Sequence, residues 1–135
     1  RGKIVYRSVA YCGNCHGWPG DGITGILLQA PRGANLRESK LDTQALIEVI
    51  KCGLPGTEMP YHSTTAYRDG SCYGMEMSDF APENKPIRGK TFREKDIVNL
   101  VAYLQTKMIG LGKPTVEECA DFFDNPAASA CGRLK

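Results

Sequence analysis

The segment Cys12-Gly-Asn-Cys15-His16 limits what this chain can fold into more than any other stretch of its sequence. It places two thiols two residues apart and a histidine directly after the second thiol. This pattern suits three kinds of chemistry: a zinc site, a redox-active disulfide, or the covalent attachment of a haem. The three alternatives require different residues and different secondary structure elsewhere in the chain.

Zinc and redox chemistry find little support in the rest of the sequence. A structural zinc ion takes four protein ligands, commonly from two Cys-x-x-Cys pairs, and this chain has no second pair. The only other histidine is His62, so a four-ligand site would have to combine it with the segment at a spacing that matches no zinc motif. A thioredoxin-like pair needs a preceding strand and a βαβ sheet, and the sequence predicts neither.

Covalent haem attachment fits both the order and the spacing of these residues. Two thiols on one helical turn can add to the two vinyl groups on one edge of a porphyrin, and the histidine that follows is then held beneath the iron. A flat apolar porphyrin also supplies a core for a chain whose short helices bury little surface on their own. We therefore expect one covalent haem c, attached at Cys12 and Cys15, with His16 as an iron ligand.

Hydrophobic periodicity predicts an all-α chain with three main helices and little strand. The predicted helices span about residues 3–14, 41–53 and 91–110. Asp42 is a candidate N-cap for the second helix, and Gly53 is placed to end it. Thr91 and Glu94 have the spacing of a capping box at the start of the third.

The 135 residues are enough for one domain and too few for two ordinary ones, so we expect a single domain over 1–135. An extended loop at 54–90 holds four of the eight prolines, and 115–135 forms a C-terminal appendage. Outside the opening motif there are four cysteines, which permit three disulfide pairings. Pairing of sequence neighbours closes the shortest loops and is our prediction: Cys52–Cys72 and Cys119–Cys131.

An electron-transfer haem also needs a second axial ligand, normally methionine or histidine. Met108 continues the apolar stripe of the third predicted helix, and Met75 and Met77 suit an apolar lining. His62, a lone loop histidine, is expected to be exposed to solvent. Met59 lies in the segment GLPGTEMPY, where glycine and proline on both sides restrict the backbone, and we predict that it is the ligand.

With the CGNCH motif, the GLPGTEMP segment and the VAYL of the last helix, the chain resembles the class I bacterial cytochromes c over residues 2–62 and 91–109. The resemblance implies the class I cytochrome c fold, with three main helices around the haem. It also implies thioether attachment at Cys12 and Cys15, and iron ligation by His16 and Met59.

Three further residues take roles from the same resemblance. Pro31 is similar to the family proline whose carbonyl accepts a hydrogen bond from the iron-ligating histidine and so orients its ring. Gly2 and Tyr103 are similar to the small and the aromatic residue where the first and last helices cross. The segment from His62 to Lys90 and the Cys119–Cys131 tail are additions to the pattern of the small family members.

The resemblance implies a monomeric, exported, periplasmic carrier of single electrons, and six cysteines also suit an oxidising compartment. The long loop and the extra disulfides are loosely similar to cytochromes that accept electrons from quinoprotein alcohol dehydrogenases. Redox partners are then expected: a quinoprotein dehydrogenase as donor, and a second cytochrome or an oxidase as acceptor. Two alternatives stay open: a haem domain or subunit of a larger oxidoreductase, and a haem sensor or enzyme with a displaceable distal ligand.

Charge and hydropathy exclude other classes of partner. The 17 Lys and Arg residues exceed the 15 Asp and Glu residues by only 2, which is too weak a charge to indicate nucleic-acid binding. No apolar run approaches the roughly 20 residues that a transmembrane helix requires. We therefore expect neither a nucleic-acid partner nor a membrane span.

Overall fold

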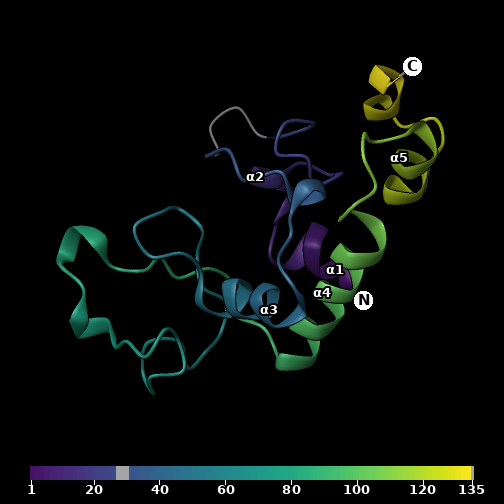
Figure 1. Ribbon diagram of the computed structural model, residues 1–135. Helices are drawn as coiled ribbons and strands as arrows, with labels where there is room; N and C mark the ends of the chain where they lie inside the picture. Colours follow the sequence, from purple (N-terminus) through teal and green to yellow (C-terminus); the bar gives the residue numbers. More distant parts are fainter. Residues whose placement is uncertain (27–30, 135) are drawn as a thin grey trace. The chain divides into compact units, whose positions relative to one another are not determined.

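The computed structural model describes residues 1–26 and 31–134 (Figure 1). The helical segments in these ranges are α1 (Gly2–Ile4), η1 (Val5–Val9), α2 (Gly13–His16), η2 (Leu36–Glu38), α3 (Thr43–Cys52), η3 (Met77–Asp79), η4 (Pro82–Asn84), α4 (Glu94–Lys107), α5 (Val116–Phe123) and η5 (Ser129–Leu134). The described residues contain no β-strand, only an isolated bridge between Tyr61 and Arg88. The all-α prediction is confirmed. Within the same ranges, no helix has the length and apolar character needed to cross a bilayer.

The helix α3 begins and ends where its capping residues predict. The side chain of Asp42 accepts a hydrogen bond from the backbone N–H of Ala45 at 2.8 Å, which satisfies one of the unpaired donors of the first turn. Gly53 ends the helix with φ = 66°, a left-handed conformation that glycine adopts without a steric penalty.

The N-terminal region departs from the prediction of one helix over residues 3–14. The short α1 continues into η1, a π-helix, and the chain then breaks before the single turn α2. The break falls at Tyr11, whose φ of 55° lies in the left-handed region and interrupts the helical path. The backbone N–H of Cys12 donates to the Tyr6 carbonyl at 3.0 Å, so the turn that carries the motif stays tied to the preceding helix.

The last long helix, α4, begins at Glu94, the second residue of the predicted capping box, and not directly after Thr91. The Arg93 carbonyl accepts hydrogen bonds from the N–H groups of Asp96 and Ile97, so Thr91 lies outside the helix and does not cap it. The apolar side of α4 is buried, as the hydrophobic stripe predicts. The buried residues of this side are Ile97, Leu100, Val101, Leu104 and, just after the helix, Met108.

The described chain separates into two compact units, which we treat one at a time. The first consists of residues 1–2 and 41–101 and contains α3. In Figure 1 the long connection after α3 runs mostly as irregular chain with short turns. The Cys52–Cys72 disulfide lies in its small core, where Tyr67 and Ala66 are also buried, so the first predicted pairing is confirmed.

The second unit consists of residues 3–40 and 102–135. Its core is aromatic: Tyr6 lies 5.9 Å from Tyr103 between ring centroids, and Phe122 of α5 packs edge-on against Tyr6 and at a tilt against Trp18. The Cys119–Cys131 disulfide joins α5 to η5, which confirms the second predicted pairing and the disulfide-held tail.

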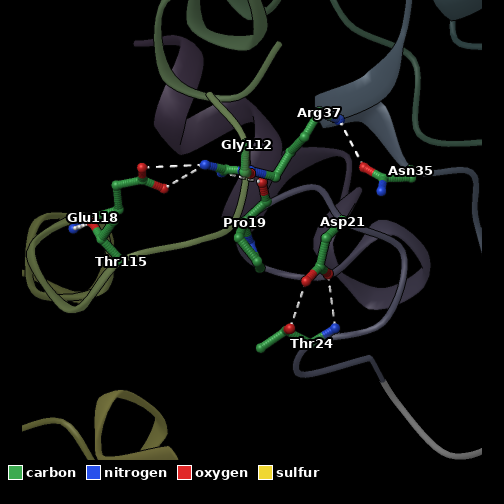
Figure 2. A network of polar contacts seen from close by, with 8 residues as sticks. All are labelled: Pro19, Asp21, Thr24, Asn35, Arg37, Gly112, Thr115 and Glu118. Carbon is green, nitrogen blue, oxygen red and sulfur yellow. Dashed lines mark hydrogen bonds and ion pairs between the residues drawn. The ribbon is translucent and has the colours of Figure 1, made fainter. Parts of the chain in front are cut away.

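A buried arginine also fastens this tail (Figure 2). The side chain of Arg37 is 2% exposed and donates hydrogen bonds to the carbonyls of Pro19 and Gly112. Its guanidinium also lies 2.9 Å from the Glu118 carboxylate in α5. Thr115 caps the N-terminus of α5, where its side chain accepts a hydrogen bond from the backbone N–H of Glu118.

Candidate functional site

The single turn α2 brings the three residues of the opening motif together. The Cys12 carbonyl accepts hydrogen bonds from the N–H groups of Cys15 at 3.2 Å and His16 at 2.9 Å, so both thiols belong to one helical turn. Neither cysteine forms a disulfide, and both are partly exposed. Burial of its sulfur raises the pKa of the Cys12 thiol to about 12.

His16 is held by the loop that follows the motif. Its Nδ1 atom lies 2.9 Å from the carbonyl oxygen of Ala34, and an imidazole that donates through Nδ1 presents Nε2 as its free lone pair. Gly33 lies directly against the ring, since a β-carbon there would be 2.5 Å from Nδ1. Burial lowers the pKa of His16, which favours the neutral imidazole that binds metals.

Two backbone hydrogen bonds tie this loop to the motif. The N–H of Gly33 donates to the Cys15 carbonyl, and the N–H of Gly22 donates to the His16 carbonyl, both at 2.7 Å. The described residues at the two ends of this loop are therefore held against the motif. Glycine at these positions allows the backbone itself to approach the motif closely.

The carbonyl that orients His16 differs from the one expected. The family resemblance assigns this role to Pro31, whereas in the structure the oxygen within hydrogen-bonding distance of Nδ1 is that of Ala34. The physical reason is that Gly33 packs on the ring, which places the carbonyl of the next residue beside the nitrogen. Sequence reasoning found the correct loop but missed Gly33 and Ala34; the only signal was the glycine two residues after the proline.

These observations fit covalent haem better than the two competing chemistries. Among residues 1–26 and 31–134, no three His, Cys, Asp or Glu side chains converge on a metal position, and this includes the combination with His62. A thioredoxin-like pair needs a neighbouring strand, which the same ranges do not contain. Two thiols on one turn followed by an anchored imidazole match what attachment of a haem requires.

Met59 belongs to the first unit, where it lies at the end of a tight loop after α3. The Met59 carbonyl accepts a hydrogen bond from the Leu54 N–H at 3.2 Å, and the Met59 N–H donates to the Thr57 hydroxyl at 3.2 Å. The same hydroxyl donates to the Leu54 carbonyl, so the turn is closed on itself. Gly53 is required at its base, because a β-carbon there would be 2.7 Å from the Met59 oxygen.

The remaining thioethers are committed to packing. The sulfur of Met108 fills the space above Gly20, where a β-carbon would be 2.5 Å from it, and this side chain is 1% exposed. Met75 and Met77 are partly buried against the core that surrounds the Cys52–Cys72 disulfide. Met59 is partly exposed and is not among the residues that form or pack on that core.

His62 is buried, which corrects the expectation that it is exposed. Its ring stacks on Phe92 at 5.0 Å between centroids, and Nδ1 lies 2.5 Å from the Lys90 carbonyl oxygen. Only 4% of the residue is exposed, and burial lowers its pKa. The residues that enclose it follow some 30 positions later, so no local pattern in the sequence predicts this environment.

Comparison with known proteins identifies one family. The model of the family described as cytochrome c oxidase, cbb3-type, subunit III matches residues 1–104. This range includes the opening motif, the loop around His16 and the Met59 turn, and it ends within α4, before α5. No curated protein and no solved structure matches the chain.

Proposed function

Because the chain belongs to the family cytochrome c oxidase, cbb3-type, subunit III, whose domain is a c-type cytochrome, we propose that it is a periplasmic carrier of single electrons. The family implies a covalently bound haem c and electron transfer through it. Such domains are typically exported, and the periplasm is the compartment we propose. The donor we propose is a dehydrogenase, with a quinoprotein dehydrogenase as candidate, and the acceptor is a second cytochrome or a terminal oxidase.

We assign the thioether bonds to Cys12 and Cys15, the proximal ligand to Nε2 of His16, and the distal ligand to the sulfur of Met59. When bound, a haem supplies an iron that gains or loses one electron between its ferric and ferrous states. With His16 and Met59 both bound to the iron, no position would be open for a substrate, which favours electron transfer over catalysis. A thioether ligand would stabilise the ferrous state more than a second imidazole would, and would so raise the reduction potential.

The observation that carries this proposal is the anchored imidazole of His16. The hydrogen bond to the Ala34 carbonyl fixes the tautomer and the ring orientation, as outer partners of metal-bound histidines commonly do. The cysteines that precede it are on the same turn. The two attachment sites for the haem and one iron ligand can therefore come from the single turn α2.

The first test is the absorption spectrum of the purified protein before and after acid–acetone extraction. Covalent haem stays with the polypeptide, whereas haem held only by ligands is extracted. Replacement of both cysteines by serine should abolish retention of the colour. A colourless wild-type protein, or one whose colour is extracted, would contradict the assignment of Cys12 and Cys15.

The distal ligand is tested by the weak far-red absorption band of a sulfur–iron bond in the oxidised protein. We expect this band in the wild type and its loss in Met59→Leu. Met77→Leu is the matched control, because it removes a thioether from the core near the disulfide in the same unit. Rapid binding of cyanide or carbon monoxide by the wild type would instead favour the sensor or enzyme alternative.

A second candidate is a haem subunit of a larger oxidoreductase, and the description of the matched family as an oxidase subunit favours it. A free-standing carrier should be a monomer in solution with reversible one-electron chemistry. An obligate subunit should aggregate alone or co-purify with an enzyme. Size measurement of the exported protein in its native host, combined with voltammetry, separates the two.

A further inference from the structure

Two tyrosine hydroxyls bind the end of α3 that leads into the Met59 turn. Tyr67 donates a hydrogen bond to the carbonyl of Cys52 at 2.5 Å, and Tyr73 donates to the carbonyl of Gly53 at 2.8 Å. Carbonyls in the last turn of a helix lack partners within the helix. The tyrosines thus satisfy two acceptors immediately before the turn.

The same short segment is joined to α3 covalently. Cys72 lies next to Tyr73 in the sequence, and its disulfide to Cys52 reaches the residue whose carbonyl Tyr67 binds. Residues 67–73 therefore contact the end of α3 at three points, one disulfide and two hydrogen bonds. We call this segment the clamp.

The backbone of the clamp is unusual at both tyrosines. Tyr67 has φ = 61° and Tyr73 has φ = 57°, left-handed conformations that are disfavoured for bulky side chains. Such conformations persist when the surrounding structure enforces them, and they concentrate at functional sites. The ring of Tyr67 packs edge-on against the rings of Tyr61 and Phe80, with distances between ring centroids of 5.6 Å and 5.4 Å. The Tyr67 hydroxyl is thus donated from a packed ring.

The point that the clamp binds is the base of the Met59 turn. Gly53, whose carbonyl receives the Tyr73 hydroxyl, packs against the Met59 carbonyl, and Leu54 donates its N–H to the same oxygen. A displacement of the α3 end would move Gly53 and break this closure of the turn. Burial also raises the pKa of Tyr67 to about 12, so its hydroxyl remains a donor at neutral pH.

We propose that Tyr67 and Tyr73 are positioning residues that hold the Met59 turn closed by anchoring the carbonyl of Cys52, the last residue of α3, and that of Gly53, which follows it. This inference rests on the proposed role of Met59 as an iron ligand. The tyrosines act through the backbone and do not touch the ligand themselves. They limit how often the turn opens and releases the thioether.

The test compares Tyr67→Phe, Tyr73→Phe and the double variant with the wild type. The first measurement is the rate at which cyanide replaces the sulfur–iron band, since cyanide binds only after the thioether has left. Each lost hydrogen bond should raise this rate about fivefold, the factor expected from the net contribution of a hydrogen bond. The second measurement is hydrogen exchange at the Leu54 amide, which reports opening of the turn directly and should accelerate by a similar factor.

Tyr61→Phe is the matched control. Its ring packs on Tyr67 in the same core, but its hydroxyl makes no hydrogen bond to the described residues, so removal should change neither rate. If Tyr67→Phe and Tyr73→Phe behave like this control in a protein that shows the far-red band, the inference about the tyrosines is overturned alone. If the wild type shows no far-red band, the assignment of Met59 is overturned and the positioning role with it.

Discussion

Gly33 packs so closely on His16 that a β-carbon at this position would lie 2.5 Å from Nδ1 and 2.7 Å from Cε1 of the imidazole. The hydrogen bond from Nδ1 to the Ala34 carbonyl depends on this approach, because Gly33 and Ala34 are consecutive. The orientation of the imidazole is therefore set by a residue without a side chain. The backbone of Gly33 is not in the left-handed region, so a larger residue is disfavoured there by the steric clash with the His16 ring alone.

Gly33→Ala should displace either the ring of His16 or the loop, at a cost of about 1–3 kcal/mol in the free energy of unfolding, as overpacked sites show. We also expect a changed spectrum of the oxidised protein, since the proximal imidazole would turn. Denaturant titration and absorption spectroscopy measure the two effects. Gly132→Ala is the control, because nothing lies within 4 Å of the corresponding position. A spectrum and stability equal to the wild type would mean that Gly33 does not set the orientation of His16.

The parts of the fold that follow local rules were predictable from the sequence. The limits of α3 follow from Asp42 and Gly53, because capping depends on residues within one turn of the helix end. Both disulfides follow from the preference for short loops. The break at Tyr11 was not predictable, because nothing in the local sequence marks an aromatic residue for a left-handed conformation.

The surroundings of the site depend on contacts between distant residues, which a single sequence does not reveal. His62 is buried by Lys90 and Phe92. Arg37 is buried by contacts with Gly112 and Glu118, which lie 75 and 81 residues later in the chain. The motif itself indicates which residues bear the chemistry. The carbonyl that orients His16 could be placed only to within the loop, since Pro31 and Ala34 are three residues apart.

Arg37→Met should destabilise the protein by about 3 kcal/mol, because it leaves the carbonyls of Pro19 and Gly112 without their donor and breaks a largely buried ion pair. Chemical denaturation of the haem-bound protein measures this change. Lys107→Met is the matched control: its contact with Asp121 is 3.9 Å long and exposed on both sides, so the loss should be about 0.5 kcal/mol or less. Equal effects of the two variants would show that Arg37 does not fasten the tail.

Removal of each disulfide should affect the Met59 turn differently. The loops of 20 and 12 residues differ by only about 0.5 kcal/mol in the chain-entropy model, so replacing either pair by serine should cost about 3 kcal/mol. Only loss of Cys52–Cys72 should also weaken the far-red band, because it releases the end of α3. Loss of Cys119–Cys131 should leave that band intact. Loss of the band in both variants would indicate a general effect of stability instead.

The buried carboxylate of Asp96 predicts how stability changes in acid. The hydrogen bond from Arg1, with Nε 2.9 Å from the carboxylate, holds the pKa of Asp96 below its ordinary value of 3.8, against the opposing effect of burial. A second ion pair joins Nε of Arg93 to the same carboxylate at 3.5 Å. Because the folded protein then binds the proton less tightly than the unfolded chain, the contribution of Asp96 is fully present above about pH 4 and is lost as pH falls through its lower folded pKa.

Asp96→Asn should therefore lower the free energy of unfolding at pH 7, and the gap to the wild type should shrink below about pH 4. Denaturant titrations at a series of pH values measure this gap. Glu94→Gln serves as the comparison, since its ion pair with Lys51 lies on the surface, with the Glu94 side chain 79% exposed, and should contribute little at any pH. A gap for Asp96→Asn that is constant from pH 7 to pH 2 would mean that the carboxylate of Asp96 titrates equally in the folded and unfolded protein, and that Arg1 does not stabilise its charge.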